Sequence, residues 1–402
     1  CQKLFMIHFG IFFHKFLLWP MPVWCILLVY PVHFSMLKWL LSSVLTDFTW
    51  LSYNRNKIRL YFYKLQPFDN ETKLTGLGFS AIIKMLWTIR DAKGLYEIIE
   101  NYFTCQFIKN EVNRIMWIAN GWKEYEVIDT SCGEKLERWG NYLLVRPDPQ
   151  VIWDTPKTEP GWRKMNAHYH RSSKGGGEWE FFDLPQQWDL HYKDLTFHLK
   201  PFSFKHTGLF PEQAVNWDFA MNKIKEAKRP IKVLNLFGYT GAASLACAGA
   251  GAEVCHVDAS KGMVAWAKEN AVSSGLADKP IRWLVDDCVK FVQREQRRGN
   301  TYDGIIMDPP SYGRGPGGEV WKLEEQLYHL VELCLPILSK QPLFFILNSY
   351  TTGLSPAVME YLLGVMLKKP FGGTVSSSEI GLPVTSSGFV LPCGSTAIWQ
   401  SK

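Results

Sequence analysis

The sequence predicts an α/β fold: an open, mostly parallel, seven-stranded sheet in the C-terminal half, preceded by a small β-rich domain and an atypical N-terminal extension. Two observations lead to this prediction. From about residue 206 onward, short apolar segments alternate without a gap with segments of helical spacing. Before that, short alternating segments broken by turn residues indicate β-hairpins. We therefore expect three parts, residues 1–120, 121–205 and 206–402.

The N-terminal part differs in composition from the rest of the chain. Residues 16–37 contain no Asp, Glu, Lys or Arg, and their length suits a membrane span. However, Pro20, Pro22 and Pro31 each remove a backbone donor from this segment. We expect an atypical extension; membrane contact through residues 16–37 is not favoured, and an interaction module is the third alternative. Residues 77–119 have helix-like spacing.

The net charge of +6 comes entirely from the start of the chain. Residues 1–68 hold seven Lys or Arg and one acid, so the remaining chain has equal numbers of basic and acidic residues. Net charge therefore gives no support for a nucleic-acid substrate, although local basic patches remain open.

Nine cysteines are scattered without C-x-x-C pairs or histidines at zinc spacing. This pattern is typical of a reducing compartment, and we expect a cytoplasmic protein with buried thiols and no metal site. His168, His170 and His191 are interpreted as surface or packed residues rather than ligands.

In the β-rich part, strands are expected at 141–146, 178–182 and 195–200, with a flexible loop at 172–177. This part is dense in Trp and Tyr. Aromatic side chains of this kind can stack on bases, but we expect most of them to form the core.

The C-terminal part begins with a helix at Phe210–Gln213, where Pro211 suits the first turn and Glu212 the positive helix end. Helices separate the first six of the strands that follow, and a turn joins the last two. This is a series of five parallel β-α units followed by an antiparallel hairpin. The seven strands are expected near 231–237, 252–258, 280–286, 302–308, 342–348, 374–381 and 388–399.

A glycine turn follows the first of these strands, in the sequence Lys-Val-Leu-Asn-Leu-Phe-Gly-Tyr-Thr-Gly at 232–241, and Asp258 closes the next strand. Such a turn lets a ligand approach the backbone, and the acid can accept both ribose hydroxyls of an adenosine. Because only Gly238 and Gly241 are present, S-adenosylmethionine (SAM), which has no phosphate, is favoured over a dinucleotide. Alternatively, Asp258 is a helix N-cap, a role that Ser260 could take instead.

Two further strand ends carry acids. Asp287 is placed to accept a hydrogen bond from the adenine amine, with Asp286 as the competing choice. Asp308 comes next to the sulfonium and the substrate, and Pro309 and Pro310 fix the backbone behind it. Such a loop can accept hydrogen bonds from an amine that is being methylated.

Beyond this acid, residues 313–318 are glycine-rich and are interpreted as a mobile lid. Arg314 is either a phosphate contact or, as we favour, a solvated loop residue.

These segments resemble the class I SAM-dependent methyltransferases, and more narrowly the group related to large-subunit ribosomal RNA methyltransferases with an N-terminal β-hairpin domain. The resemblance covers roughly 125–402 and implies a Rossmann-like seven-stranded SAM-methyltransferase sheet with SAM as cofactor. It rests on Val233 to Ala243, Asp258, Asp287, Asp308 to Tyr312 and Asn348 to Thr352. The expected cofactor-binding residues are Gln213, Phe237, Gly238, Thr240, Gly241, Asp258, Ala259, Asp286, Asp287 and Asp308. The expected catalytic residues are Asp308, Pro309, Pro310 and Tyr312.

The sequence departs from this group in two places. Members that methylate carbon 5 of a pyrimidine use a cysteine near the fourth or fifth strand end, where this chain has Ser311-Tyr312 and Asn348-Ser-Tyr350. Amine methylases place an aromatic residue directly after the two prolines, where Ser311 stands here, so Tyr312 can point elsewhere. We expect a nitrogen or oxygen acceptor.

The predicted function is SAM-dependent methyl transfer to RNA, with ribosomal RNA as substrate and the β-rich domain facing it. Two alternatives remain: a methyltransferase with a protein or small-molecule acceptor, and a SAM-binding adaptor without turnover. The intact Asp308-Pro-Pro segment argues against the adaptor, because a binding protein needs no preorganised acceptor loop.

Overall fold

The computed structural model describes residues 51–54, 57–60, 116–172, 176–202, 204–314, 320–351 and 353–402. The predictions for residues 16–37 and for most of 77–119 lie outside this range. In the described part of the chain, no helix is long and apolar enough to cross a membrane. The chain divides into two compact units, Cys1–Tyr102 and Phe103–Lys402. In the first, β1 (Leu51–Asn54) pairs antiparallel with β2 (Lys57–Leu60); the second holds all features discussed below.

The second unit contains an eight-stranded sheet in the order β13-β12-β11-β14-β17-β19-β18-β3, in which the seven predicted strands are extended at one edge by the additional strand β3 (Trp117–Ile118). The first five of these strands are parallel, and β19 runs antiparallel to both β17 and β18. All seven expected strands are confirmed within a few residues. The strands are β11 (Lys232–Leu236), β12 (Glu253–Asp258), β13 (Ile281–Val285), β14 (Gly304–Met307), β17 (Phe344–Ser349), β18 (Thr374–Pro383) and β19 (Val390–Gln400).

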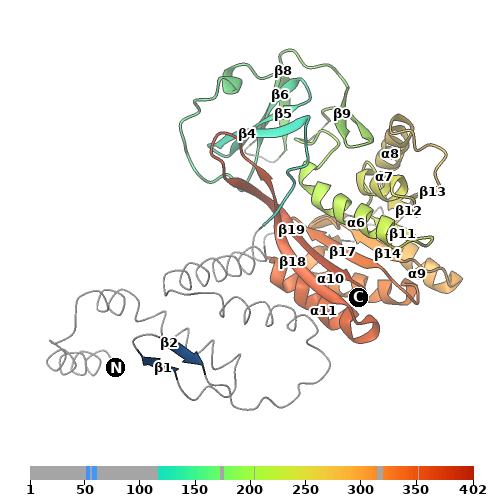
Figure 1. The fold of residues 1–402 in the computed structure, drawn as a ribbon. Helices are drawn as coiled ribbons and strands as arrows, with labels where there is room; N and C mark the ends of the chain where they lie inside the picture. Colours follow the sequence, from blue (N-terminus) through green and yellow to red (C-terminus); the bar gives the residue numbers. More distant parts are fainter. Residues whose placement is uncertain are drawn as a thin grey trace. The chain divides into compact units, whose positions relative to one another are not determined.

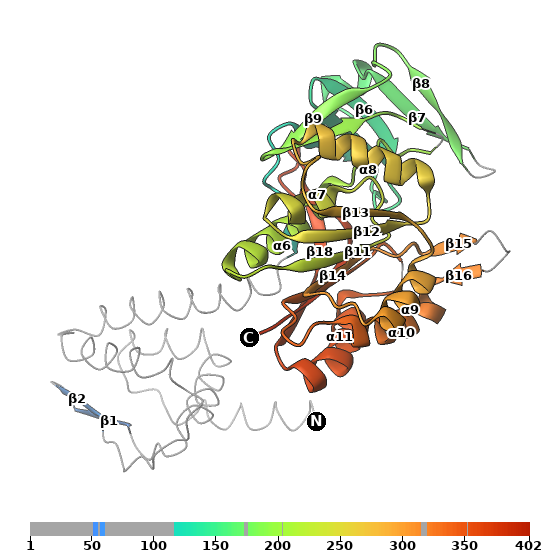
Figure 2. The ribbon, with the colours of Figure 1, turned by 90° about the vertical axis from the view of Figure 1, so that its right-hand side faces the viewer.

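Helices cover both faces of this sheet (Figure 2). One group packs against β11, β12 and β17 through small residues such as Ala220, Cys247 and Ala248. The other group packs on the opposite face through larger side chains such as Phe291, Leu330 and Leu363. The first group is α6 (Ala214–Glu226), α7 (Ala242–Gly249) and α8 (Lys261–Ser273); the second is α9 (Cys288–Arg298), α10 (Leu323–Cys334) and α11 (Pro356–Phe371).

The β-rich part forms a five-stranded sheet, β4-β5-β6-β7-β8, beside the hairpin of β9 and β10 (Figure 1). The strands are β4 (Tyr125–Ser131), β5 (Glu134–Trp139), β6 (Tyr142–Pro147), β7 (Ala167–Arg171), β8 (Gly177–Phe181), β9 (Trp188–Tyr192) and β10 (Leu195–Leu199). Six of its ten Trp and Tyr side chains are buried, in agreement with the expected core role, among them Trp139, Tyr169 and Tyr192. Phe181, Phe182 and Phe204 are instead more than half exposed.

Two local expectations need correction. The helix-like spacing of residues 77–119 does not extend to its end, because β3 (Trp117–Ile118) is extended and pairs in parallel with β18 at Ile380 and Gly381. The expected lid is bounded by paired strands, β15 (Tyr312–Arg314) and β16 (Val320–Lys322), so its ends are held as a hairpin. Residues 315–319 between them lie outside the described range, as do 173–175 of the loop expected at 172–177.

A buried ionic cluster lies within the β-rich sheet. The Glu137 side chain is fully buried and accepts hydrogen bonds from Arg146 at 2.6 and 2.8 Å and from the Tyr125 hydroxyl at 2.7 Å. Burial alone would raise the pKa of Glu137, but Arg146 and Lys135 outweigh it and lower that pKa to about 2. The carboxylate is therefore fully compensated inside the protein.

Candidate active site

Four of the singled-out positions lie side by side where parallel strands end. Leu236 of β11 pairs with Val257 of β12 and with Met307 of β14, and Met307 pairs with Leu347 of β17. The next residue along each strand therefore stands at the same level of the sheet. We call these four residues, Phe237, Asp258, Asp308 and Asn348, the strand-end row; it lies at the edge where open α/β sheets bind ligands.

The glycine turn after β11 is held in a strained shape by the protein itself. Phe237 and Tyr239 have φ values of 56° and 50°, which are unfavourable for residues with a side chain. The amide of Phe237 donates to the Cys288 thiol at 3.4 Å, and that of Gly238 donates to the Val257 carbonyl at 3.0 Å. The turn therefore offers a fixed shape.

Gly238 and Gly241 are required for packing. A Cβ on Gly238 would lie 2.3 Å from the buried His256 imidazole, and one on Gly241 would lie 2.8 Å from the Ala267 Cβ. Gly241 also has a φ of 90°. The close neighbours of this turn in the structure are side chains of β12 and α8, and the predicted approach of a ligand to its backbone stays a prediction.

Asp258 links the turn to the second strand. Its Oδ2 accepts from the amide of Tyr239 at 2.9 Å, and its Oδ1 accepts from the amide of Ser260 at 2.8 Å. Ser260, in turn, caps α8, with its hydroxyl accepting from the Met263 amide at 3.4 Å. Each carboxylate oxygen thus keeps lone-pair capacity for a further donor, as two ribose hydroxyls require. Burial raises the pKa of Asp258, and the two amide bonds oppose that shift.

The two candidate adenine contacts already have protein partners. The Asp287 side chain caps α9 by accepting from the Lys290 amide at 2.8 Å, and it is exposed. Asp286 is paired with the Arg294 guanidinium. Ala259 is exposed at the end of β12. The contacts of Asp286, Asp287 and Ala259 with an adenine therefore stay predictions.

Asp308 has a different environment from the other acids. Among the described residues, only Asn348 donates to its carboxylate, from Nδ2 to Oδ1 at 3.0 Å. Burial raises the pKa of Asp308 to about 7; the bond from Asn348 lowers it, and the nearby Glu212 adds to the rise. The side chain is only partly covered, so an incoming donor can reach it.

A buried chain of neutral groups fixes Asn348. The Thr396 hydroxyl donates to Asn348 Oδ1 at 2.6 Å, and Asn216 Nδ2 donates to the Thr396 oxygen at 3.1 Å. Because the Asn348 oxygen is engaged by this hydroxyl, its amide nitrogen must face Asp308. Asn216, Asn348 and Thr396 are at most 2% exposed.

The same chain continues to a second buried acid. Asn216 Nδ2 also donates to Gln213 Oε1 at 2.8 Å, and Gln213 Nε2 donates to the Tyr350 hydroxyl at 2.9 Å. That hydroxyl donates to Glu212 Oε1 at 2.9 Å. Burial raises the pKa of Glu212, whereas Lys135 opposes the shift. Both ends of the Gln213 amide are therefore used within the protein, and its predicted SAM contact stays a prediction.

The remaining predicted residues are placed as follows. Thr240 is buried, with its hydroxyl donating to the Gly208 carbonyl at 2.6 Å, so its side chain is turned into the protein. Pro309 is buried, and the Pro310 carbonyl accepts from Trp321 Nε1 at 2.6 Å. Tyr312 is 53% exposed on the β15–β16 hairpin, and its catalytic role stays a prediction.

Several residues of this site were not assigned a site role from the sequence. Asn348 could have been, because it ends a strand just as Asp308 does. The sequence could not assign a role to Tyr350 or to the Cys288 thiol, which accepts a hydrogen bond from the turn, because both roles depend on contacts between segments far apart in the chain.

The residues fit SAM on three structural observations. The amides of Phe237, Gly238 and Tyr239 are all engaged by protein acceptors, so these three donors are not free to bind a pyrophosphate. Asp258 retains acceptor capacity for ribose. Asp308 is a carboxylate without a cation partner among the described residues, which suits a site for a positively charged sulfonium.

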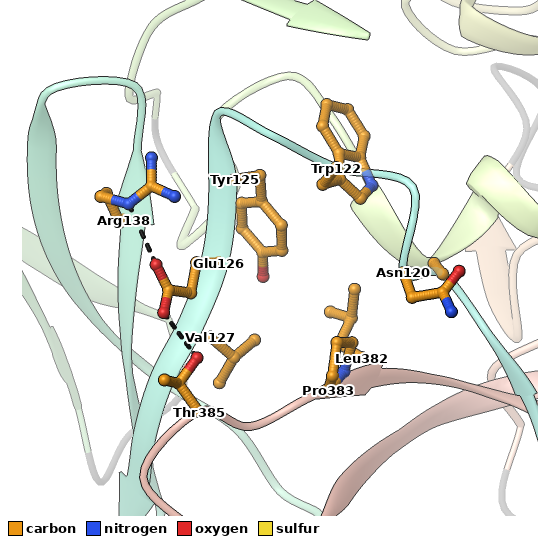
Figure 3. A pocket seen from close by; sticks show the side chains of 10 residues that line it. Asn120, Trp122, Tyr125, Glu126, Val127, Arg138, Leu382, Pro383 and Thr385 are labelled. Atoms are coloured by element: carbon orange, nitrogen blue, oxygen red, sulfur yellow. Dashed lines mark hydrogen bonds and ion pairs between the residues drawn. The ribbon is translucent and has the colours of Figure 1, made fainter. Parts of the chain in front are cut away.

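A cavity of about 190 Å³ lies elsewhere, between the segment before β4, the β5 strand and the end of β18 (Figure 3). None of the strand-end row lines it. Its charged groups pair with each other: Arg138 binds Glu126 at 3.1 Å, and the Thr385 hydroxyl donates to the same carboxylate at 2.5 Å. We assign this cavity no part in the chemistry.

Comparison with known proteins agrees with this site. Residues 135–342 match the family described as S-adenosylmethionine-dependent methyltransferase. A SAM-dependent methyltransferase structure from Agrobacterium tumefaciens is 40% identical with a TM-score of 0.68, covering 72% of this chain and 94% of that one. A methyltransferase structure from Streptococcus mutans, 19% identical with a TM-score of 0.53 and covering 74% of this chain and 79% of that one, shares the fold.

A curated relative is longer than this chain. The ribosomal RNA large subunit methyltransferase K/L of Pseudoalteromonas atlantica is 33% identical over an alignment of 240 positions, which covers 53% of this chain and 32% of the relative. The chain thus matches about a third of that relative's length. The matched family, the Agrobacterium structure and the strand-end row agree: this chain belongs to the S-adenosylmethionine-dependent methyltransferase family.

Proposed function

We propose that this protein transfers the methyl group of SAM to a nitrogen or oxygen atom of RNA, with ribosomal RNA as the substrate. The observation that supports the chemistry best is Asp308, an accessible carboxylate at the cofactor edge whose only described donor is a neutral amide. The RNA substrate is supported by the name of the Pseudoalteromonas relative. Exposed Phe181, Phe182 and Phe204 on and beside the β-rich sheet offer ring faces for base stacking.

The proposed roles follow from the contacts. Bound SAM supplies an electrophilic methyl group. Asp308 accepts a hydrogen bond from the N–H or O–H of the acceptor and directs its lone pair toward that methyl. When the methyl carbon is transferred to the acceptor, its bond to the sulfonium sulfur would break to leave S-adenosylhomocysteine, and the acceptor's proton would pass to the Asp308 carboxylate, whose pKa of about 7 suits this transfer near neutral pH. Asn348 keeps the carboxylate oriented.

Thiol chemistry is disfavoured at this site. Cys288 and Cys334 are buried in α9 and α10, and Cys393 is half-buried in β19. Burial raises the pKa of all three thiols, whereas a nucleophilic cysteine needs a lowered pKa. This supports a nitrogen or oxygen acceptor over pyrimidine carbon 5. The six described cysteines are free, in keeping with the reducing, cytoplasmic location that we infer.

The test uses full-length protein and SAM with a tritiated methyl group. A cell lysate is divided into RNA, protein and small-molecule fractions, and each fraction is incubated with wild-type protein or with Asp308→Asn. We expect label in ribosomal RNA that ribonuclease releases and that Asp308→Asn abolishes. Label confined to protein or small molecules would overturn the RNA substrate, and label unaffected by Asp308→Asn would overturn the proposed role of this residue.

A further inference from the structure

The β7–β8 hairpin brings two histidines and two glutamates onto one face. His168 and His170 are two residues apart on β7, and Glu178 and Glu180 are two residues apart on β8. In the antiparallel register, His168 lies opposite Glu180, and His170 lies opposite Glu178. Because alternate residues share a face and paired residues point to the same side, all four side chains leave the same side of the hairpin.

The opposite face of the hairpin is mostly apolar, with the exposed Arg171 at its end. Tyr169 is 3% exposed and meets the Trp179 ring at 5.4 Å, while Ala167, paired with Phe181, is fully buried. The alternation therefore sorts core residues to one side and potential ligands to the other. The polar side is a built surface rather than a random group of charges.

The ligand atoms of this face converge. The rings of His168 and His170 are 4.0 Å apart, and one ligand atom from each of His168, His170 and Glu180 lies within 4.8 Å of the others. His170 Nε2 is 2.8 Å from Glu180 Oε2, and His168 Nε2 is 2.6 Å from Glu134 Oε1. Both imidazoles thus present the same nitrogen toward carboxylates.

We propose that His168, His170 and Glu180 bind one divalent transition-metal ion of the zinc class, with the carboxylate of Glu134 as a neighbouring fourth ligand. Imidazole nitrogen and carboxylate oxygen are the donors that Zn²⁺ takes at about 2.0–2.2 Å. Lys157 donates to the other Glu134 oxygen at 2.6 Å and so orients that carboxylate.

Charge at the site also suits a cation. Two glutamates face one lysine, and the two imidazoles bind metal in their neutral form. The ion would join β5, β7 and β8 across the sheet. The site contains none of the strand-end row, so it does not depend on the proposed methyl transfer and would act on the stability of the β-rich part.

The chain offers a matched control. His191 on β9 forms one isolated pair with Glu124, at 3.0 Å, and both side chains are about half exposed, like those of His170 and Glu180. If the β7–β8 face holds only ordinary histidine–glutamate pairs, the two locations should respond to metal in the same way. If the face is a metal site, substitutions of His170 or Glu180 should weaken metal binding, and a substitution of His191 should not.

The experiment titrates tag-free, full-length protein with Zn²⁺ by calorimetry and with Co²⁺ by absorption spectroscopy. We expect one ion per chain, at least tenfold weaker binding in His170→Asn and in Glu180→Gln, and unchanged binding in His191→Asn. Zn²⁺ should also raise the Tm of the wild type but not that of the two site variants. SAM affinity serves as the folding control for every variant.

Three outcomes would overturn the proposal. One is the absence of stoichiometric binding to the wild type. Another is binding that both site variants retain. The third is a thiolate charge-transfer band in the Co²⁺ spectrum, which would assign the ion to cysteines such as the exposed Cys132.

Discussion

Asp308 is a partly buried carboxylate and Glu137 a fully buried one, yet the protein treats them in opposite ways. Glu137 is surrounded by Arg146, Lys135 and the Tyr125 hydroxyl, and its pKa falls to about 2. Within the described part of the chain, Asp308 receives one hydrogen bond, from a neutral amide, and its pKa rises to about 7. Burial acts in the same direction on both, so the partners decide the outcome.

The difference distinguishes a carboxylate that stabilises the fold from one that is oriented for the proposed reaction. The ionic cluster around Glu137 satisfies its charges completely and holds β5 to β6. The neutral chain from Thr396 through Asn348 fixes the position of Asp308 without neutralising it. A carboxylate that is oriented but uncompensated can take a proton near neutral pH, which a compensated one cannot.

The largest expected effect is on Asp308. In Asp308→Asn the side-chain shape is kept but the proton acceptor is lost, so turnover should fall by roughly 10²–10⁴-fold. SAM affinity should change far less, because Asp258 and the glycine turn are intact. Tritium transfer measures the first quantity and calorimetry the second; a parallel loss of both would assign Asp308 to cofactor binding alone.

Breaking the compensated carboxylate should affect folding instead. Arg146→Met leaves Glu137 buried without its main partner and should lower the free energy of unfolding by about 3–5 kcal/mol. Lys232→Met, which removes an exposed pair with Glu253, should lower it by only about 0–1 kcal/mol. Urea denaturation gives both values, and equal losses would refute the distinction between the two pairs.

The pH dependence of stability should have opposite signs for the two acids. Glu137 has a lowered pKa, so its contribution is present above about pH 4.5 and is lost as pH falls toward 2. Asp308 has a raised pKa, so protonation of this acid favours the folded protein over the unfolded one. The contribution of Asp308 to the free energy of unfolding is therefore lost as pH rises from about 4 to 7.

Replacing Asp308 by Asn should therefore remove that loss. At pH 8, Asp308→Asn should be more stable than the wild type by roughly 2–4 kcal/mol, whereas at pH 4 the two proteins should differ little. Denaturation at both pH values measures this. A stability difference that does not change with pH would show that Asp308 titrates normally.

The smallest effect is expected at Asn348. Asn348→Ala removes the only described donor to Asp308, so the pKa of Asp308 should rise further, and the midpoint of the kcat/KM profile should move upward by about one pH unit. Asn166→Ala is the control: Asn166 also donates and accepts through its side chain, but within the β-rich part. A shift of the midpoint in both variants would mean that the midpoint responds to a general loss of rigidity in the protein and not to the environment of Asp308.

Much of this site follows from local sequence, and the rest does not. The strand ends at Asp258 and Asp308 were predictable because apolar periodicity sets where each strand stops. The environment of Asp308 was not, since Asn216 and Thr396 meet across 180 residues of chain. Likewise, the spacing of His168 and His170 on one strand is visible in the sequence, but the approach of Glu180 depends on the hairpin register.

The central claim is that Asp308 is uncompensated, and a direct titration tests it. Protein carrying ¹³C at aspartate Cγ is followed by NMR from pH 3 to pH 9 without SAM, and the Asp308 signal is assigned by its absence from Asp308→Asn. A midpoint near pH 7 is the expected result. A midpoint near pH 4, the ordinary value for aspartate, would contradict the account.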